Sequence, residues 1–105
     1  MAEKSRWQIR MDLAKARDQA SKLEEAARSI RSESRRFETC RNNVRHAWEG
    51  DNANRFTGKM GLVSEDLAGI AKQLEKTAGV IRKNAQNIYE AEMEAKRLAE
   101  IRSHS

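Results

Sequence analysis

A single break divides an otherwise continuous helical pattern, and it lies almost at the centre of the 105-residue chain. Trp48-Glu49-Gly50 marks this break, and the absence of proline means that no other position forces a helix to kink or end. On each side of the break, apolar residues recur every three or four positions, and strand alternation fits neither half. The sequence therefore predicts two long helices, at about residues 6–47 and 53–101, joined by a turn at about 48–52.

The apolar pattern predicts one core face on each helix. The first face consists of Leu13, Leu23, Ile30, Phe37 and Val44, and the second of Phe56, Met60, Leu67, Ile70, Leu74, Ile81 and Ile88. The connection is too short for anything but an antiparallel hairpin, so we expect an all-α fold with a single domain over residues 1–105. Ser34 and Asn84 interrupt the two faces, and either fix the register as buried polar residues or lie exposed where the helices separate.

The residues at the predicted helix ends agree with these bounds. Ser5, with Gln8 three positions later, is typical of a capping box at the start of the first helix. Gly50 suits the left-handed conformation that often ends a helix. Asp51 or Asn52 is expected to cap the second helix, because either side-chain oxygen can accept from first-turn N–H groups.

A row of alanines lies one position beyond the predicted core face of the second helix. The row consists of Ala71, Ala78, Ala85 and Ala99. Small residues in a row let another helix approach closely, so we predict that the hairpin dimerises into a four-helix bundle. The alternative is that these alanines serve helix propensity alone.

Charge and composition narrow the classes of function. The net charge of +5 is concentrated in an arginine-rich segment of the first helix, with Arg28, Arg31, Arg35, Arg36, Arg41 and Arg45. These cations form either a solvated helix face or a docking site for an acidic partner. A nucleic-acid interface is the weaker alternative, because no aromatic residues interleave the arginines to stack bases.

The sequence shows no machinery for catalysis or cofactor binding. His46 and His104 are far apart, and neither lies at a spacing typical of a metal site with Cys40 or a carboxylate. Cys40 is expected to be a small residue at the edge of the core. The charged N-terminus has no apolar segment typical of a signal peptide, and no run is long enough to insert into a membrane. We therefore expect a non-enzyme made in the cytoplasm, without a cofactor or a small-molecule substrate.

These residues resemble the WXG-100 family of small type VII secretion proteins, which are helical hairpins with Trp-x-Gly at the bend. The resemblance rests on Trp48 and Gly50, on Ala53 and Phe56 opening the second helix, and on the length of the chain. It implies a homodimer, or a heterodimer with a related hairpin, exported through a secretion ATPase without a cleaved signal peptide. The alternative that it implies is a cytoplasmic adaptor that escorts a larger secreted toxin. Trp48 would then close the end of the hairpin by packing near Val44 and Phe56.

The resemblance also implies a C-terminal export signal, from which this chain departs. The family often has a tyrosine followed four residues later by an acid, whereas here Met93 occupies that position after Tyr89. Glu92 and Glu94 lie on either side of Met93, and all three fall inside the predicted helix. We expect either a variant signal formed by Tyr89, Glu92 and Glu94 or a signal shared with a partner.

Overall fold

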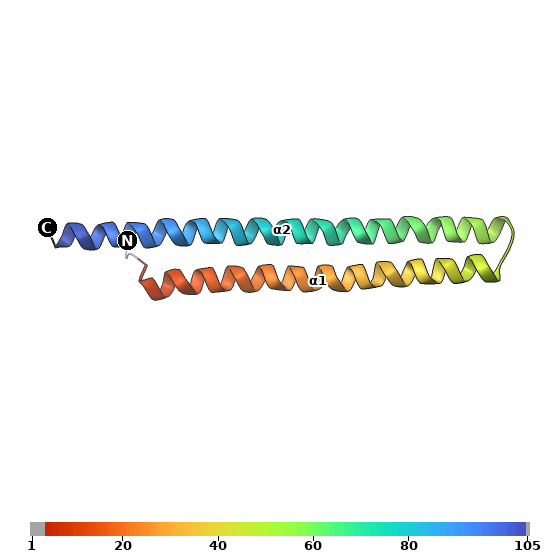
Figure 1. The fold of residues 1–105 in the computed structure, drawn as a ribbon, viewed down its shortest axis with the longest axis horizontal. Coiled ribbons are helices and arrows are strands. Elements are labelled where there is room, and N and C mark those ends of the chain that lie inside the picture. Colours follow the sequence, from red (N-terminus) through yellow and green to blue (C-terminus); the bar gives the residue numbers. More distant parts are fainter. Residues whose placement is uncertain (1–3, 105) are drawn as a thin grey trace. The chain divides into compact units, whose positions relative to one another are not determined.

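A computed structural model of the protein describes residues 4–104, which form two α-helices and no strand (Figure 1). Helix α1 runs over Arg6–Ala47 and helix α2 over Asp51–Ser103. The chain divides into two units, and each contains an α1 segment that lies antiparallel to an α2 segment. Unit 1 pairs the chain up to Lys22 with the part from Thr77 onward, and unit 2 is Leu23–Lys76. The predicted all-α hairpin is confirmed.

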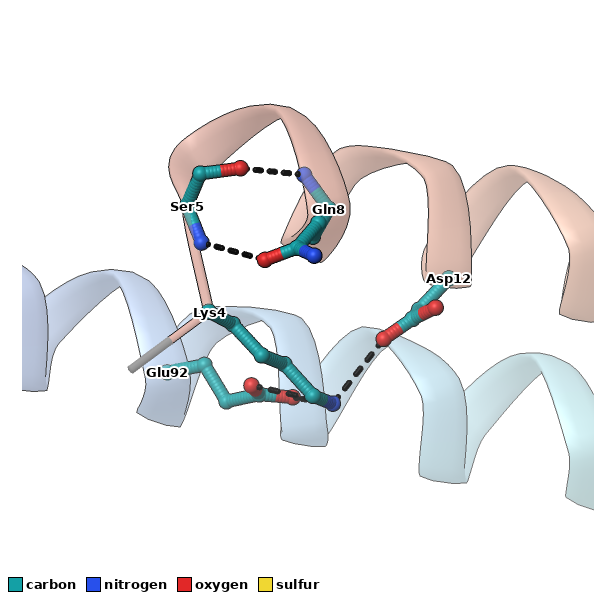
Figure 2. Close-up of polar contacts among 5 residues, drawn as sticks. All are labelled: Lys4, Ser5, Gln8, Asp12 and Glu92. Atoms are coloured by element: carbon teal, nitrogen blue, oxygen red, sulfur yellow. Dashed lines mark hydrogen bonds and ion pairs between the residues drawn. The ribbon is translucent and has the colours of Figure 1, made fainter. Parts of the chain in front are cut away.

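The predicted capping box starts helix α1. The Ser5 backbone N–H donates to Gln8 Oε1 at 2.8 Å, and the Gln8 N–H donates to Ser5 Oγ at 3.1 Å (Figure 2). The Ser5 carbonyl also accepts from the Ile9 N–H at 3.0 Å. Because first-turn N–H groups have no partner inside the helix, this reciprocal pairing stabilises the start of α1 at Arg6.

The turn between the helices is shorter than predicted. The Trp48 N–H donates to the Val44 carbonyl at 2.8 Å, and the Gly50 carbonyl accepts from the Asn54 N–H at 3.1 Å. Gly50 has φ of 107°, which confirms its predicted left-handed conformation. Since Gly50 itself begins the hydrogen-bonding of α2, the helix starts at Asp51, two residues before the predicted position, and the turn comprises only residues 48–50.

The capping residue proposed for α2 was therefore wrong. Asp51 and Asn52 lie inside the first turn of α2, where the Asp51 carboxylate suits the positive end of the helix dipole. At its other end α2 continues to Ser103, two residues beyond the predicted end. The Ser103 hydroxyl donates to the Glu100 carbonyl at 2.9 Å, which satisfies one of the acceptors that a helix end leaves free.

Small side chains form much of the core, particularly on α2. In unit 1 the buried residues are Ile9, Leu13 and Ala20 from α1 and Ala78 from α2. In unit 2 they are Ala27 and Ser34 from α1, with Ala53, Thr57, Met60, Gly61, Ser64 and Ala71 from α2. Alanine, serine and threonine at successive core positions allow two helix backbones to pack closely.

The predicted core face of α1 is correct, but that of α2 is displaced by one residue. Leu13 is buried, and the remaining α1 members are half-buried, namely Leu23, Ile30, Phe37 and Val44. On α2, Met60 is buried, and Leu67, Leu74 and Ile81 are half-buried. Phe56, Ile70 and Ile88 are instead 44%, 50% and 56% exposed. Thr57 and Ala71 occupy the core positions assigned to Phe56 and Ile70.

Two members of the alanine row, Ala71 and Ala78, therefore have a different role from the predicted one, whereas Ala85 is half-buried and Ala99 is exposed. Ala71 and Ala78 have no exposed surface, because each lies between α2 and α1 of the same hairpin. These two residues cannot receive a helix from a second molecule without opening the hairpin. Ile70, next to Ala71, and Val80, two residues from Ala78, face solvent instead.

Ser34 and Ser64 form a buried polar pair between α1 and α2 of unit 2. Ser34 Oγ donates to the Ser64 carbonyl at 2.9 Å, Ser64 Oγ donates to the Ser34 carbonyl at 3.2 Å, and the two hydroxyl oxygens are 3.0 Å apart. Sliding one helix past the other would leave these buried hydroxyls unpaired, so the pair disfavours other registers. Asn84 is exposed, so only Ser34 has the buried role that was considered for both residues.

Candidate functional site

The turn presents two aromatic side chains to solvent. Trp48 is 59% exposed, and its ring centroid lies 6.3 Å from that of Phe56, with 40° between the ring planes. This tilted arrangement is favourable for an aromatic pair. The predicted packing of Trp48 near Phe56 is confirmed, and Gly50 provides the bend that brings α2 back beside α1.

An apolar strip on α2 continues from the turn along unit 2. We define this α2 strip as Phe56, Leu62, Val63 and Ile70, all of which are exposed. Phe56, Val63 and Ile70 are seven residues apart, so they recur on the same side of the helix every two turns. Gly58 and Gly69 on the same helix have open space where a Cβ would be. Exposed apolar residues at this spacing suit contact with another helix.

The arginine-rich segment of α1 is only partly neutralised within unit 2. Arg31 pairs with Glu75 across the hairpin, and its Nε donates to Glu75 Oε2 at 3.2 Å. This hydrogen bond lowers the pKa of Glu75 and raises that of Arg31. Arg36 pairs with Glu33 at 3.2 Å, and Arg41 lies 3.6 Å from Glu38.

The other three arginines remain available to a partner. No described residue forms an ion pair with the side chains of Arg28, Arg35 or Arg45, and all three are exposed. Arg35 and Arg36 border a shallow hollow on α1 next to Cys40. Cys40 is a free, exposed thiol, so its expected place at the edge of the core was wrong.

The predicted variant export signal lies within unit 1, inside α2. Tyr89 is half-buried and borders a groove between the two helix segments, next to Ile88 and Leu13. The Glu92 carboxylate is 3.3 Å from Lys4 Nζ, which also pairs with Asp12 at 2.9 Å (Figure 2).

The two acids of this signal are therefore both engaged inside the chain. Glu94 pairs with Arg97, which lowers the pKa of Glu94. The structure brings Tyr89 and Glu92 to the same groove, whereas Glu94 is exposed and pairs along the surface of α2.

Sequence reasoning missed two features at the N-terminal end of unit 1. Lys4 and Arg6 reach α2, where they pair with Glu92 and Glu100, and the contact with Arg6 lowers the pKa of Glu100. These pairings depend on the register of the two helices, which the local pattern does not show. Trp7 is 68% exposed, and it borders a shallow hollow on α1 together with Met11, four residues later. Trp7 and Met11 lie four residues apart and outside the predicted core face, and this spacing could have predicted an exposed apolar pair from the sequence.

Side chains that could bind a metal ion do not converge in the described part of the chain. Within residues 4–104, no group of three or more histidines, cysteines or carboxylates is placed to hold a metal ion. His46 is exposed at the end of α1, and His104 follows the end of α2. Neither α1 nor α2 contains a stretch apolar enough to span a membrane over the residues described.

A comparison with known protein families found one family with the same turn motif. The WXG100 family, described as proteins of 100 residues with WXG, matches residues 8–93, which include both helices and the Trp48-Glu49-Gly50 turn. The chain belongs to the WXG100 family. As a WXG100 protein it is a small protein associated with type VII secretion. Searches of curated proteins and of solved structures gave no match.

Membership in the WXG100 family agrees with the kind of site that the geometry provides. The proteins of this family are small helical proteins secreted by type VII systems, and the family indicates binding to other proteins. Trp48 at the turn, the α2 strip and most arginines of the α1 segment are exposed. The paired rings at the turn give the WXG motif of this chain an exposed aromatic surface.

Proposed function

We propose that this WXG100 protein acts in type VII secretion by binding a second helical hairpin through the α2 strip. The partner is a second copy of the chain or a related hairpin, and the product is a four-helix assembly. The observation that carries the proposal is the exposure of Phe56, Val63 and Ile70 at seven-residue spacing. The small residues that could have served instead, such as Ala71, already lie in the hairpin's own core.

The energetics favour an arrangement in which both partners contribute a strip. Burying a fully exposed Val, Leu, Ile or Phe side chain is worth roughly 1.5–3 kcal/mol. The four residues of the α2 strip are about half exposed, so one strip contributes on the order of 4 kcal/mol. Association costs at least about that much in lost freedom of motion. A two-fold assembly uses the same strip on each copy and so roughly doubles the gain.

In this proposal the turn and the C-terminal part of α2 serve export. Trp48 and Gly50 form a surface for the secretion ATPase, and the protein leaves the bacterial cytoplasm without a cleaved signal peptide. Tyr89 and Glu92, which share a groove, form the variant export signal together with Glu94. The exposure of Trp48 supports the first role, and the half-buried position of Tyr89 means that only part of its ring meets solvent.

Sedimentation velocity over a range of protein concentrations tests the binding role. About 4 kcal/mol remains after the cost of association, so we expect the natural chain to form a dimer at concentrations on the order of 1 mM. It should form a heterodimer when mixed with the partner hairpin that co-purifies from its host. The double variant Val63→Ser with Ile70→Ser should remain helical but fail to associate. The control variant Gln73→Ser, at an exposed polar position of the same helix, should associate normally. Equal association of the double variant and the control would contradict the proposal.

A second candidate is a cytoplasmic adaptor that delivers a larger secreted toxin with an acidic helical domain. The specific observation in its favour is that Arg28, Arg35 and Arg45 are exposed and form no ion pair within residues 4–104. Affinity purification from the native host separates the two candidates. Recovery of one much larger acidic protein, with none of the small chain in the culture medium, supports the adaptor. Recovery of a small hairpin, with export of the chain, supports the first proposal.

A further inference from the structure

Arg41 occupies a position in unit 2 where the helical pattern calls for an apolar residue. It lies on the core face of α1, between Phe37 and Val44, and its side chain is only 26% exposed. The guanidinium group rests against α2 at Gly61. A Cβ at position 61 would be 3.0 Å from Arg41 Cζ, and 3.2 and 3.3 Å from the two terminal nitrogens. Glycine at this position therefore leaves the space that the guanidinium group occupies.

This arrangement lowers stability on both helices. The Arg41 Nε–H is buried and has no hydrogen-bond acceptor, and the nearest carboxylate oxygen, on Glu38, is 3.6 Å from Nη1. A buried donor left without a partner destabilises the fold, because it loses its hydrogen bond to water and gains none in the protein. Glycine inside a helix is also less favourable than alanine. An apolar residue at 41 with alanine at 61 would remove both costs. Where a fold departs from local rules in this way, a functional role is the expected reason.

The surroundings of Arg41 indicate the charge of the group that it would meet. Between residues 28 and 45, α1 carries six arginines and two glutamates, and Arg28, Arg35 and Arg45 form no ion pair with a described residue. A guanidinium group can donate two parallel hydrogen bonds to one carboxylate, a geometry that satisfies Nε together with a terminal nitrogen. The contact with Gly61 involves only the end of a flexible side chain, so Arg41 can leave it without moving either backbone.

We propose that Arg41 recognises an acidic helical polypeptide that docks on α1 of unit 2. Before docking, its guanidinium group is held against Gly61. On docking, the guanidinium group leaves Gly61 and binds a carboxylate of the partner, while Arg28, Arg35 and Arg45 supply the surrounding positive charge. This inference rests on the adaptor form of the proposed function and names the residue that would give it specificity. It separates Arg41 from the other arginines, which act through charge alone.

Binding of a defined probe to matched variants tests this role. The probe is a synthetic helical peptide with glutamates at heptad spacing along one face, and its glutamine counterpart is the control, both followed by fluorescence anisotropy. Arg41→Met should weaken binding of the glutamate peptide about tenfold, which corresponds to about 1.4 kcal/mol. Arg10→Met removes the same charge from an exposed position in unit 1 and should weaken it less than about twofold. Gly61→Ala fills the space beside Arg41, so it should strengthen binding several-fold.

Three outcomes would overturn the inference. They are an equal effect of Arg41→Met and Arg10→Met, weaker binding by Gly61→Ala, and binding of duplex DNA as strong as that of the peptide. Thermal unfolding shows that the Arg41→Met variant is folded, because loss of the unpaired Nε–H should leave it at least as stable as the natural chain. Sedimentation velocity of the same variants distinguishes this inference from the proposed self-association. Association through the α2 strip should be the same with arginine or methionine at position 41.

Discussion

Replacing Ala71 with leucine would test which side of α2 faces α1. Ala71 has no exposed surface in unit 2, so the three extra carbons of leucine would have to fit between two helices that are already in contact. Overpacking of this kind costs about 1–3 kcal/mol. Alanine and leucine differ by only a few tenths of a kcal/mol in helix propensity, so nearly all of the loss reports packing. For a chain of this size the midpoint of thermal unfolding should fall by roughly 5–20 °C.

Circular dichroism at one fixed protein concentration is the appropriate assay, because association would itself change the midpoint. Gln73→Leu is the matched control, since it places the same side chain at an exposed position two residues away. It should change the free energy of unfolding by less than about 0.5 kcal/mol. If Ala71→Leu were as stable as this control, Ala71 would lie on an outer face and the register described for α2 would be wrong.

Three further changes probe the turn and the charge pairs. Gly50→Ala places a Cβ on a residue with φ of 107°, so the free energy of unfolding should fall by about 1–3 kcal/mol. The control Gly58→Ala, where a Cβ has open space, should raise it by about 1 kcal/mol, and equal chemical-denaturation midpoints would refute the strain at Gly50. Trp48→Ala removes one tilted ring contact and should lower the free energy of unfolding by no more than about 1.5 kcal/mol, with the far-ultraviolet circular dichroism unchanged. Export of this variant from the native host should be reduced, and normal export would show that Trp48 is not part of the proposed recognition surface. Arg31 lowers the pKa of Glu75 below its usual value near 4.5, so this pair stabilises the fold above about pH 4.5 and loses its effect as the pH falls through the lowered pKa. Glu75→Gln should therefore flatten the fall in melting temperature between neutral and acidic pH. An unchanged profile would show that the pair contributes nothing.

The ends of α1 were the most predictable part of the fold, because local chemistry determines them. Ser5 and Gln8 satisfy each other's backbone donors within a few residues, so the signal needs no information from the rest of the chain. Gly50 was equally clear as the residue that permits a left-handed backbone. The error at the start of α2 arose because the Gly50 carbonyl already accepts the first helical hydrogen bond, which leaves Asp51 and Asn52 inside the helix.

Parts of the candidate site could not be predicted from the sequence, because they depend on which residues face each other across the hairpin. The pairing of Lys4 with Glu92 joins positions 88 residues apart, and it is decided only once α1 and α2 have a definite register. The same is true of Arg41 and Gly61, whose contact joins α1 to α2 in unit 2. The position of the arginines along α1 was readable, but which of them are neutralised by Glu75 was not.

The register of α2 shows why an apolar pattern alone can assign the wrong face. Along this helix Phe56, Val63 and Ile70 lie directly beside Thr57, Ser64 and Ala71, and the larger residues dominate any count of hydrophobicity. A pair of helices, however, gains from close approach, which small residues allow and large ones prevent. The reciprocal hydrogen bonds between Ser34 and Ser64 add a term that favours the same choice. The large residues are therefore left outside the pair, where burial requires another polypeptide, and the apparent mismatch between pattern and core is itself the argument for an α2 docking face.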